Sequence, residues 1–291
     1  MKKIIATMLA ATMVIGLTAC GSSATTEASE ASAQEASTEA SEASVQETSA
    51  DDAQVSEEAS TAVSEAIADG VLTVGTNAEF PPFEYVGDDG NPDGFDMALI
   101  KAVGEKIGVE VQIENMEFAS LVSSIGNKID VAIAGMTVTE ERQQTVDFSD
   151  SYYDAVQYVI VPKDSTIATA DDLVGKNIGV QLGTTGDFIA TDIEGSNVSS
   201  YNKAVDAVND LLNGRVDLVI IDKNPALVFT GKYPDDLVAM DGSQFGFEVE
   251  NYAIAMPKGD TALVDAVNNA IAELKADGTF DSLVQKYIEE N

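Results

Sequence analysis

From residue 71 onward, segments with strand character alternate with segments of helical periodicity almost to the end of the chain. Strands are expected at 71–76, 109–114, 130–134, 156–161, 177–181, 198–201, 216–221 and 252–256. Helices are expected at 95–107, 118–126, 185–192, 203–212, 223–230, 260–273 and 278–289. This alternation predicts an α/β protein whose sheets are mostly parallel, with helices on both faces.

The α/β part of the chain is expected to form two lobes, because its length of about 220 residues exceeds the common size of a single domain. The segments 158–163 (YVIVPK) and 252–258 (YAIAMPK) are near-copies that both end in Pro-Lys. We expect them to run side by side as a two-strand hinge. Lobe 1 would then be 71–160 plus 257–291, and lobe 2, including the hinge strands, would be 161–256. A chance likeness of two apolar strands is the alternative, and it would leave the segment between them without a distinct role.

The amino terminus has the pattern of a bacterial secretory signal. Two lysines precede an apolar run at 4–17, which is too short to span a bilayer comfortably. The run ends in LTAC at 17–20, which resembles the cleavage motif of bacterial lipoproteins, and Cys20 is the only cysteine. We therefore expect a signal peptide at 1–20 that ends at a lipid-modified Cys20, anchoring the chain to the outer face of the cytoplasmic membrane.

Residues 21–69 have the composition of a disordered segment. They are mainly Ser, Ala, Thr, Glu and Gln, with twelve acidic residues and no Lys or Arg. Such a segment cannot bury enough apolar surface to offset the entropy cost of ordering. A flexible chain of this length reaches on the order of 40 Å, which is enough to hold a folded domain clear of a membrane. We interpret it as a tether, with a partner-binding acidic tail as the alternative.

The chain has a formal net charge of −35 and contains no histidine. The negative charge argues against binding to nucleic acids or to anionic lipids. The absence of histidine excludes imidazole general bases and imidazole metal ligands. Because the single cysteine is expected to carry lipid, thiolate metal sites are excluded as well, and we expect no metal and no cofactor. Catalysis, if any, would depend on carboxylates, Lys, Tyr or Arg.

The run AGMTVTEER at 134–142 marks a candidate site. An apolar strand ends at Gly135, and a helix begins after Thr139, whose hydroxyl can cap it. Arg142 then lies one turn into this helix, near the carboxyl end of the strand, where ligands bind in open α/β sheets. Its planar guanidinium suits bidentate capture of a carboxylate. Taken alone, an arginine that follows two glutamates is more often a solvated surface residue.

Four segments carry a resemblance to a known family. They are GTNAEFPPFEY at 75–85, GFD at 94–96, the run from 134 to 153, and VDLVIID at 216–222. In this order and at this spacing they resemble the extracellular solute-binding proteins of ABC transporters for polar amino acids, bacterial solute-binding protein family 3, in lipoprotein form. The resemblance implies a two-lobed, periplasmic-binding-protein-like fold, in which each lobe is a mostly parallel sheet flanked by helices. It also implies a monomeric binding protein, not an enzyme, that works with an ABC permease and its ATPase.

The resemblance assigns the two charged ends of an amino-acid ligand to opposite lobes. Arg142, Thr137 and the backbone N–H of Gly135 would hold the α-carboxylate of the ligand. Thr185, in a Gly-rich turn that opens a helix, would add to this group from the second lobe. Asp222, at the end of a predicted strand, would bind the α-ammonium group. From the sequence alone, capping of the following helix is the more usual role for such an aspartate.

The side chain of the ligand would lie among aromatic and polar residues. By resemblance, Phe80 and Phe118 are its aromatic walls, although Phe118 also suits an ordinary core position at the start of a helix. The residues left to read the side chain are Asn77, Glu79, Asp96 and Gln181. Many relatives have Asp where this chain has Asn77, so one counter-charge is missing here. Glu79 and Asp96 could still pair with a cationic group, which gives a slight preference for Arg or Lys, followed by Gln.

These observations predict a lipid-anchored receptor that captures a polar L-amino acid between two lobes and delivers it to a permease. An enzyme of the dehydratase type on the same scaffold is one alternative, with Glu79 as the only candidate proton donor. A sensory amino-acid receptor without transport is another alternative. Genes for a permease and an ATPase beside this one would favour transport over sensing.

Overall fold

The computed structural model describes residues 64–289 of the 291-residue chain. The predictions of a signal peptide, of lipidation at Cys20 and of most of the tether lie outside the described residues. Within residues 64–289, no helix combines the length and the apolar character that crossing a bilayer requires.

The last residues of the predicted tether, 64–69, are part of the folded structure. Ser64 caps a short 3₁₀ helix, η1 (Glu65–Ile67), by accepting a backbone hydrogen bond. Its hydroxyl also donates to Asp260 at 2.5 Å, and the side chain of Ile67 is buried in the core. The prediction of disorder up to residue 69 is therefore wrong at its carboxyl end, because a buried isoleucine and a doubly bonded serine hold this turn in place.

The first lobe is built on a five-stranded sheet. The strand order is β5 (Glu110–Asn115), β1 (Val71–Thr76), β6 (Val131–Ala132), β14 (Ala255–Pro257) and β7 (Val146–Phe148). β1 pairs in parallel with β5 and β6, whereas β14 is antiparallel to β6 and β7. The parallel half of the sheet follows from the alternating strand and helix pattern, and β14 runs the other way because the chain returns to this lobe from the second one.

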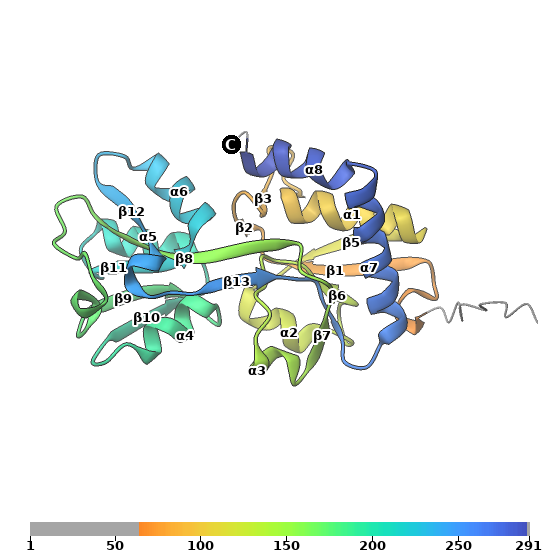
Figure 1. Ribbon diagram of the computed structural model, residues 1–291, viewed down its shortest axis with the longest axis horizontal. Coiled ribbons are helices and arrows are strands. Elements are labelled where there is room, and N and C mark those ends of the chain that lie inside the picture. Colours follow the sequence, from red (N-terminus) through yellow and green to blue (C-terminus); the bar gives the residue numbers. More distant parts are fainter. Residues whose placement is uncertain (1–63, 290–291) are drawn as a thin grey trace, which may run out of the picture. The chain divides into compact units, whose positions relative to one another are not determined.

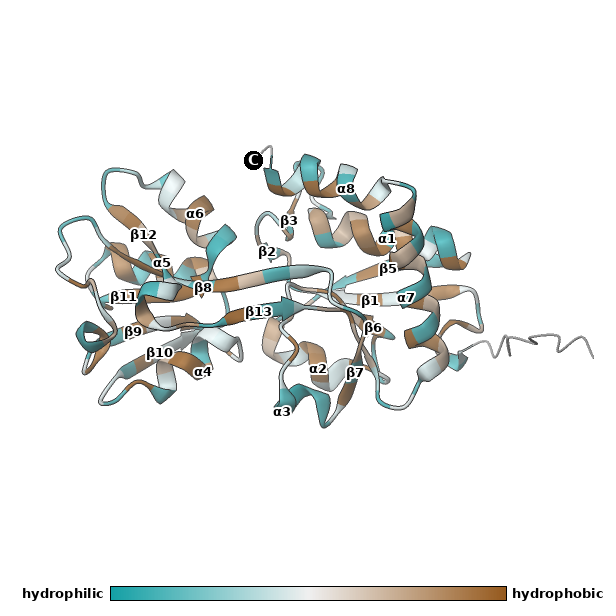
Figure 2. Cartoon of the chain, viewed as in Figure 1, coloured by the Kyte–Doolittle hydropathy of each residue, from teal (hydrophilic) through white to brown (hydrophobic). Residues whose placement is uncertain are grey.

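The helices of the first lobe are α1 (Phe95–Ile107), α2 (Leu121–Ser124), α3 (Glu140–Gln143), α7 (Thr261–Ala276) and α8 (Thr279–Val284), with short turns at η2 (Phe118–Ser120) and η5 (Gln285–Glu289). α1 packs against α7 and α8 (Figure 1). Leu99, Ile100 and Val103 of α1 are fully buried, at the spacing of one helical face. Figure 2 shows the same property as a change between hydrophobic and hydrophilic colours along α1, α7 and α8.

Between β1 and α1 the chain forms a small antiparallel sheet that the sequence did not predict. It consists of β2 (Glu79–Phe80), β3 (Glu84–Val86) and β4 (Pro92–Asp93). Strands of two or three residues are too short to show an alternating pattern of apolar side chains. The small sheet carries Phe80 and Glu84, which both belong to the site described below.

The second lobe is built on a sheet with β8 as its longest strand. The order is β10 (Asn197–Tyr201), β9 (Asn177–Gln181), β11 (Leu218–Asp222), β8 (Tyr153–Pro162) and β12 (Leu237–Asp241), and β13 (Val249–Tyr252) also pairs with β8. β9 is parallel to β10 and β11, whereas β8 is antiparallel to its three partners. The helices are α4 (Thr185–Asp192), α5 (Ala204–Leu212) and α6 (Lys223–Lys232), with turns at η3 (Ala170–Leu173) and η4 (Gly242–Phe245).

Two antiparallel strands join the lobes, as predicted, but the paired residues lie earlier in each strand than the predicted ones. β8 and β13 lie antiparallel, with Tyr153 opposite Tyr252 (Figure 1). The predicted partners do not pair: 158–162 lies beside β11 and β12 in the second lobe, and β14 lies in the first lobe. The predicted pairing of 158–163 with 252–258 is wrong because one strand carries the chain from the first lobe to the second and the other carries it back. The residues that follow the two crossings therefore enter opposite lobes, however similar their sequences are.

Candidate functional site

A small pocket lies between the two lobes. It is lined from the first lobe by Asn77, Phe80, Glu84, Phe118, Ala134, Gly135, Thr137 and Arg142, and from the second by Gln181, Thr184, Thr185 and Asp222. Asn77 follows β1, Gln181 ends β9 and Asp222 ends β11, so the pocket lies at the carboxyl ends of parallel strands. Of the eleven predicted ligand-binding residues, nine line this pocket. Their contacts with a ligand stay a prediction.

Arg142 is held at the pocket by a short capped helix. Thr139 caps α3 by accepting a hydrogen bond from the backbone N–H of Arg142, as the sequence predicted. The guanidinium donates to the carbonyl oxygens of Thr137 at 2.6 Å and Gly183 at 3.0 Å. Its carbon lies 5.4 Å from the centre of the Phe118 ring, so one face of that ring packs against the arginine of the site.

The charge of Arg142 is buried without a counter-ion. The residue is 8% exposed, and no carboxylate of residues 64–289 forms an ion pair with it. Burial lowers the pKa of the guanidinium, and the more distant charges of Glu250 and Asp222 oppose this. A buried cation that is bonded only to neutral carbonyl oxygens favours an anionic ligand, because the ligand would offset the cost of desolvation.

Asp222 is a buried acid at the end of β11. It occupies the cap position of α6, but its side chain makes no capping hydrogen bond, so the role that the sequence alone favoured is not observed. Its carboxylate accepts a hydrogen bond from the hydroxyl of Tyr252 at 2.5 Å. Burial, together with the nearby charge of Glu250, raises the pKa of Asp222 to about 7. An ammonium group placed beside it would favour the ionised carboxylate.

Glu84 is a pocket residue that the sequence analysis missed. It lies in β3, is fully buried, and neither of its carboxyl oxygens finds a hydrogen-bond donor among residues 64–289. Burial raises the pKa of Glu84 well above its usual value, and the neighbouring carboxyl group of Asp96 adds to this. A proton held between these two acids relieves their repulsion. The only signal in the sequence was the place of Glu84 within the segment 75–85, which carries the family resemblance.

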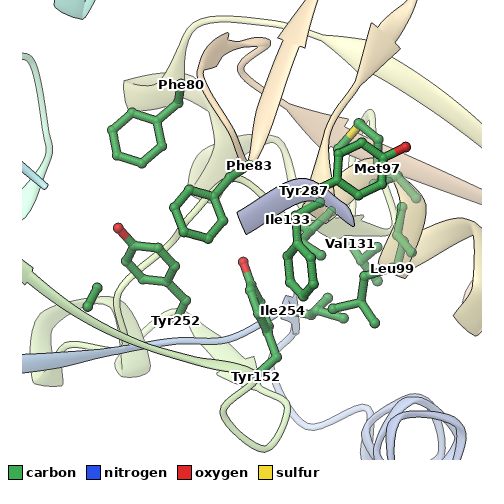
Figure 3. Packing of buried hydrophobic residues seen from close by; sticks show 14 of the residues in the cluster. Phe80, Phe83, Met97, Leu99, Val131, Ile133, Tyr152, Tyr252, Ile254 and Tyr287 are labelled. Carbon is green, nitrogen blue, oxygen red and sulfur yellow. The ribbon is translucent and has the colours of Figure 1, made fainter. Parts of the chain in front are cut away.

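A cluster of aromatic rings packs against Phe80, which lines the pocket. Phe83 contacts Phe80 and Tyr252, with ring centres 6.1 and 5.2 Å apart, and Tyr152 lies 6.3 Å from Tyr252 (Figure 3). The hydroxyls of Tyr152 and Tyr252 each donate to a buried aspartate. The aromatic cluster therefore does more than exclude water, because it also supplies the donors that hold two carboxylates in fixed positions.

The structure corrects the predictions for Asp96 and Gly135. Asp96, in α1, is fully buried and accepts hydrogen bonds from the N–H of Gly135 and the hydroxyl of Tyr152, both at 2.8 Å. Asp96 therefore does not line the pocket, and the Gly135 N–H that was predicted to hold the ligand already has a partner. The reason is that a buried backbone N–H requires an acceptor. Burial raises the pKa of Asp96 to about 6, although its two donors act in the opposite direction.

With this geometry in place, the comparison with known families is decisive. The model of the bacterial extracellular solute-binding proteins, family 3, matches residues 72–290. The chain belongs to this family. At the level of the family, it is an amino-acid-binding component of ABC transporters and not an enzyme.

Individual relatives of this solute-binding protein have different named ligands. The L-cystine-binding protein TcyJ of Escherichia coli (strain K12) is 35% identical over 222 residues, which cover 75% of this chain and 82% of TcyJ. The arginine-binding extracellular protein ArtP of Bacillus subtilis (strain 168) is 36% identical over 220 residues, which cover 74% of this chain and 85% of ArtP. The structure of holo ArgBP from T. maritima has a TM-score of 0.68 at 44% identity, covering 76% of this chain and 97% of that chain. The fold of this solute-binding protein is accordingly the two-lobed one that the resemblance implied.

In this solute-binding protein, Glu79 lies outside the pocket. Successive residues of a strand point to opposite sides, so Phe80 lines the pocket and Glu79 faces away from it. The carboxylate of Glu79 forms an ion pair with Lys203, which precedes α5 in the second lobe. Glu79 is therefore not placed to read a ligand side chain, and the dehydratase alternative loses the only proton donor proposed for it.

Asn77 and Gln181 meet across the cleft. The side-chain Nε2 of Gln181 donates to Oδ1 of Asn77 at 2.9 Å, and Nδ2 of Asn77 donates to the carbonyl oxygen of Met116 at 2.9 Å. Nearby, Nδ2 of Asn202 donates to Oε1 of Glu117 at 2.8 Å. The Gln181–Asn77 and Asn202–Glu117 bonds join the two lobes, and the first of them uses amide groups that the sequence had assigned to the ligand.

Glu250 is a second acid that the sequence analysis missed. It lies in β13, and its Oε2 accepts hydrogen bonds from the hydroxyls of Thr137 at 2.6 Å and Thr185 at 2.7 Å. Nε2 of Gln157 donates to the same oxygen at 3.4 Å. No strand was predicted at 249–252, so nothing in the sequence indicated which of its side chains face the site.

The acids of the site do not amount to a metal centre, since no group of three or more Asp, Glu, His or Cys in residues 64–289 is placed to hold a metal ion.

Proposed function

We propose that this protein captures a cationic L-amino acid, with L-arginine preferred, and delivers it to the permease of an ABC transporter. The observation that carries the proposal is the set of charges in the pocket. Within residues 64–289 the pocket offers one buried cation, Arg142, and two buried acids without a cationic partner, Asp222 and Glu84. An amino acid with a cationic side chain has the complementary set of one carboxylate and two cations.

The main-chain groups of the ligand are proposed to bind at opposite lobes. The α-carboxylate pairs with Arg142, whose fork of N–H groups matches carboxylate geometry. The amino terminus of α4, which begins at Thr185, adds the positive end of a helix dipole from the second lobe. The α-ammonium binds at Asp222, where its charge would lower the raised pKa of that acid.

The cationic end of the ligand is proposed to lie near Glu84. A guanidinium or ammonium group would favour the ionised form of this buried acid, because opposite charge offsets desolvation. The ring of Phe80 lines the same pocket, and stacking of a cation on such a ring contributes about 0.5–2 kcal/mol. Arginine is favoured over lysine and glutamine because ArtP is named for arginine binding and a structure of ArgBP is of its arginine-bound form.

Closure of the lobes on the ligand is proposed as the signal to the transporter. Arg142 and Phe80 line the pocket from the first lobe and Asp222 and Thr185 from the second, and all four are proposed to contact the ligand. Only a ligand that binds the closed form better than the open form can drive closure, and contacts from both lobes supply this difference. Micromolar affinity corresponds to about −8 kcal/mol, which is in the range expected for such a set of contacts.

The protein is further proposed to be a monomer that is anchored by lipid on Cys20 at the outer face of the cytoplasmic membrane, with a tether between the anchor and the lobes. The signal pattern, the LTAC motif and the composition of 21–63 support this part of the proposal. A Cys20→Ala variant is expected to leave the membrane fraction. Its retention there after fractionation of the cells would contradict lipid anchoring.

Calorimetric titration with arginine, lysine, histidine, glutamine and cystine tests the choice of ligand, using protein freed of bound solute by unfolding and refolding. Arginine is expected to bind with a Kd of about 1 μM or below. Glu84→Gln is expected to weaken arginine binding by about tenfold or more and glutamine binding by less than about threefold, because it removes the acid that faces the side-chain cation. Glu114→Gln, an exposed position on β5, is the matched control. If no amino acid of this panel binds to the wild type, the proposal is wrong.

A further inference from the structure

Glu250 has no part in the ligand contacts proposed above, yet it touches both sides of the pocket. β13 places it opposite Ala155 of β8, in the segment that joins the two lobes. Its Oε2 accepts a hydrogen bond from Thr137 in the first lobe and another from Thr185 in the second. One carboxylate oxygen therefore connects hydroxyl groups of opposite lobes.

These two hydrogen bonds decide what the threonine hydroxyls can offer to a ligand. A hydroxyl group has one proton to donate and two lone pairs that accept. Because Thr137 and Thr185 both donate to Glu250, neither hydroxyl can also donate to the α-carboxylate of a ligand. The oxygen of Thr185 already accepts from Nε2 of Gln157 at 3.1 Å, which is consistent with its proton pointing to Glu250. Both oxygens keep a lone pair, so they suit an ammonium group.

We propose that Glu250 is a positioning residue that orients the hydroxyls of Thr137 and Thr185 as acceptors for the α-ammonium of the ligand and ties the two lobes together in the closed form. This inference rests on the proposed amino-acid ligand. The α-carboxylate is then left to Arg142, and the ammonium is shared between Asp222 and the two hydroxyl oxygens. The earlier assignment of both threonines to the carboxylate would be reversed for their side chains.

The electrostatics of the site agree with this arrangement. Burial lowers the pKa of Arg142 and raises that of Asp222, and the negative charge of Glu250 opposes the first effect and adds to the second. Glu250 therefore lies within electrostatic reach of both residues proposed to hold the ends of the ligand. Burial has the larger effect on both pKa values, so we expect the position of the Glu250 carboxyl oxygen, and not its charge, to carry the role of this residue.

Two substitutions separate the position of the carboxyl oxygen from its charge. Glu250→Gln keeps an acceptor oxygen at the same reach and removes the charge, whereas Glu250→Asp keeps the charge and shortens the side chain by one methylene. Glu250→Asp is expected to raise the Kd for arginine by about tenfold or more, and Glu250→Gln by less than about threefold, because the acceptor geometry carries the effect. Glu248→Asp, at an exposed position two residues earlier, is the matched control and is expected to bind as the wild type does.

The melting temperature of each ligand-free variant is measured beside its Kd. A lower melting temperature of Glu250→Asp with an unchanged Kd would mean that Glu250 is only part of the scaffold, and the inference would be overturned. If Glu250→Gln loses as much affinity as Glu250→Asp, charge and not position matters, and the inference is again overturned. Thr185→Val serves if Glu250→Asp does not fold, and binding equal to that of the wild type would contradict the role of its hydroxyl. Since every comparison starts from a wild type that binds arginine, failure of the proposed function is seen separately, as a wild type that binds no amino acid.

Discussion

The two sides of the pocket are held in place in different ways. On the first-lobe side, Gly135 is bonded to Asp96 within its own lobe, and Arg142 is bonded both to Thr137 in its own lobe and to Gly183 in the second. On the second-lobe side, the principal groups are bonded to the hinge or to the other lobe, namely Asp222 with Tyr252 and Gln181 with Asn77. Each half therefore has bonds of both kinds, but the bonds that hold Gly135 and the first bond of Arg142 are made within the first lobe, whereas Asp222 depends on the hinge and Gln181 is shared between Asn77 and Asn202. We therefore expect a ligand to meet the arginine side first and closure to complete the site.

The strongest test of the difference between the two sides is to remove the guanidinium group of Arg142. Arg142→Ala is expected to weaken arginine binding by at least about 100-fold, because the carboxylate of the ligand would be buried without a partner. Arg215 is the only other arginine of the chain and provides the matched control, since it is exposed and pairs with Asp210. Calorimetry on both variants checks the prediction. An Arg142→Ala protein that binds as tightly as Arg215→Ala would show that the first-lobe side is not where the carboxylate binds.

The next effect concerns the protons that the buried acids hold before a ligand arrives. The pKa of Asp96 is raised to about 6 and that of Asp222 to about 7, mainly by burial, whereas an unfolded aspartate has a pKa of about 3.9. The folded state therefore keeps these protons at a pH where the unfolded state has lost them. Their contribution to stability is present below about pH 4 and is lost as the pH rises through about 6 and 7.

The affinity for the ligand is expected to rise with pH, whereas the stability of the ligand-free protein falls. The ammonium of the ligand requires ionised Asp222, so affinity should rise between about pH 5 and pH 8, by up to about tenfold for each pH unit and proton released. The measurement is the melting temperature with and without arginine across this range, together with calorimetry in two buffers of different ionisation enthalpy to count the protons released. If arginine raises the melting temperature by the same amount at pH 5 and at pH 8, Asp222 is already ionised before binding. The second-lobe side of the pocket would then be as ready for the ligand as the first-lobe side.

Local patterns in the sequence predicted much of the fold. β1 and β9 have the predicted bounds, and so do α1 and α4, because apolar periodicity and end signals agree in these segments. The cap of α3 by Thr139 was also predicted, since it depends on residues that are neighbours along the chain. The small sheet from β2 to β4 was missed, because strands of two or three residues leave no periodic signal.

The parts of the site that the sequence did not predict depend on distant pairs. Glu250 contacts Thr137 from 113 positions away, and nothing in either local segment indicates that contact. Glu84 is buried beside Asp96 because two separate elements, β3 and α1, meet there. The assignment of Asp96 to the ligand was wrong for a related reason. The sequence showed that Asp96 is charged, but it did not show that the backbone N–H of Gly135, 39 positions away, is the group that donates to it.

The smallest expected effect comes from the contact between the lobes outside the pocket. Glu79 and Lys203 form an ion pair across the cleft, and the side chain of Lys203 is 53% exposed. Exposed ion pairs contribute little, because water screens them and two long side chains lose freedom when they pair. Glu79→Gln is therefore expected to change the Kd for arginine by less than about threefold, and the change should shrink further in about 0.5 M salt.

A double-mutant cycle with Lys203→Ala separates the ion pair from any direct role of Glu79. If the two substitutions have the same small effect and are not additive, the pair only assists closure, and the pocket itself accounts for the affinity. If Glu79→Gln alone costs more than about tenfold, and Lys203→Ala does not, then Glu79 contacts the ligand after all. In that case the lobes must close differently around the ligand, and the first-lobe side would be less preformed than its internal hydrogen bonds indicate.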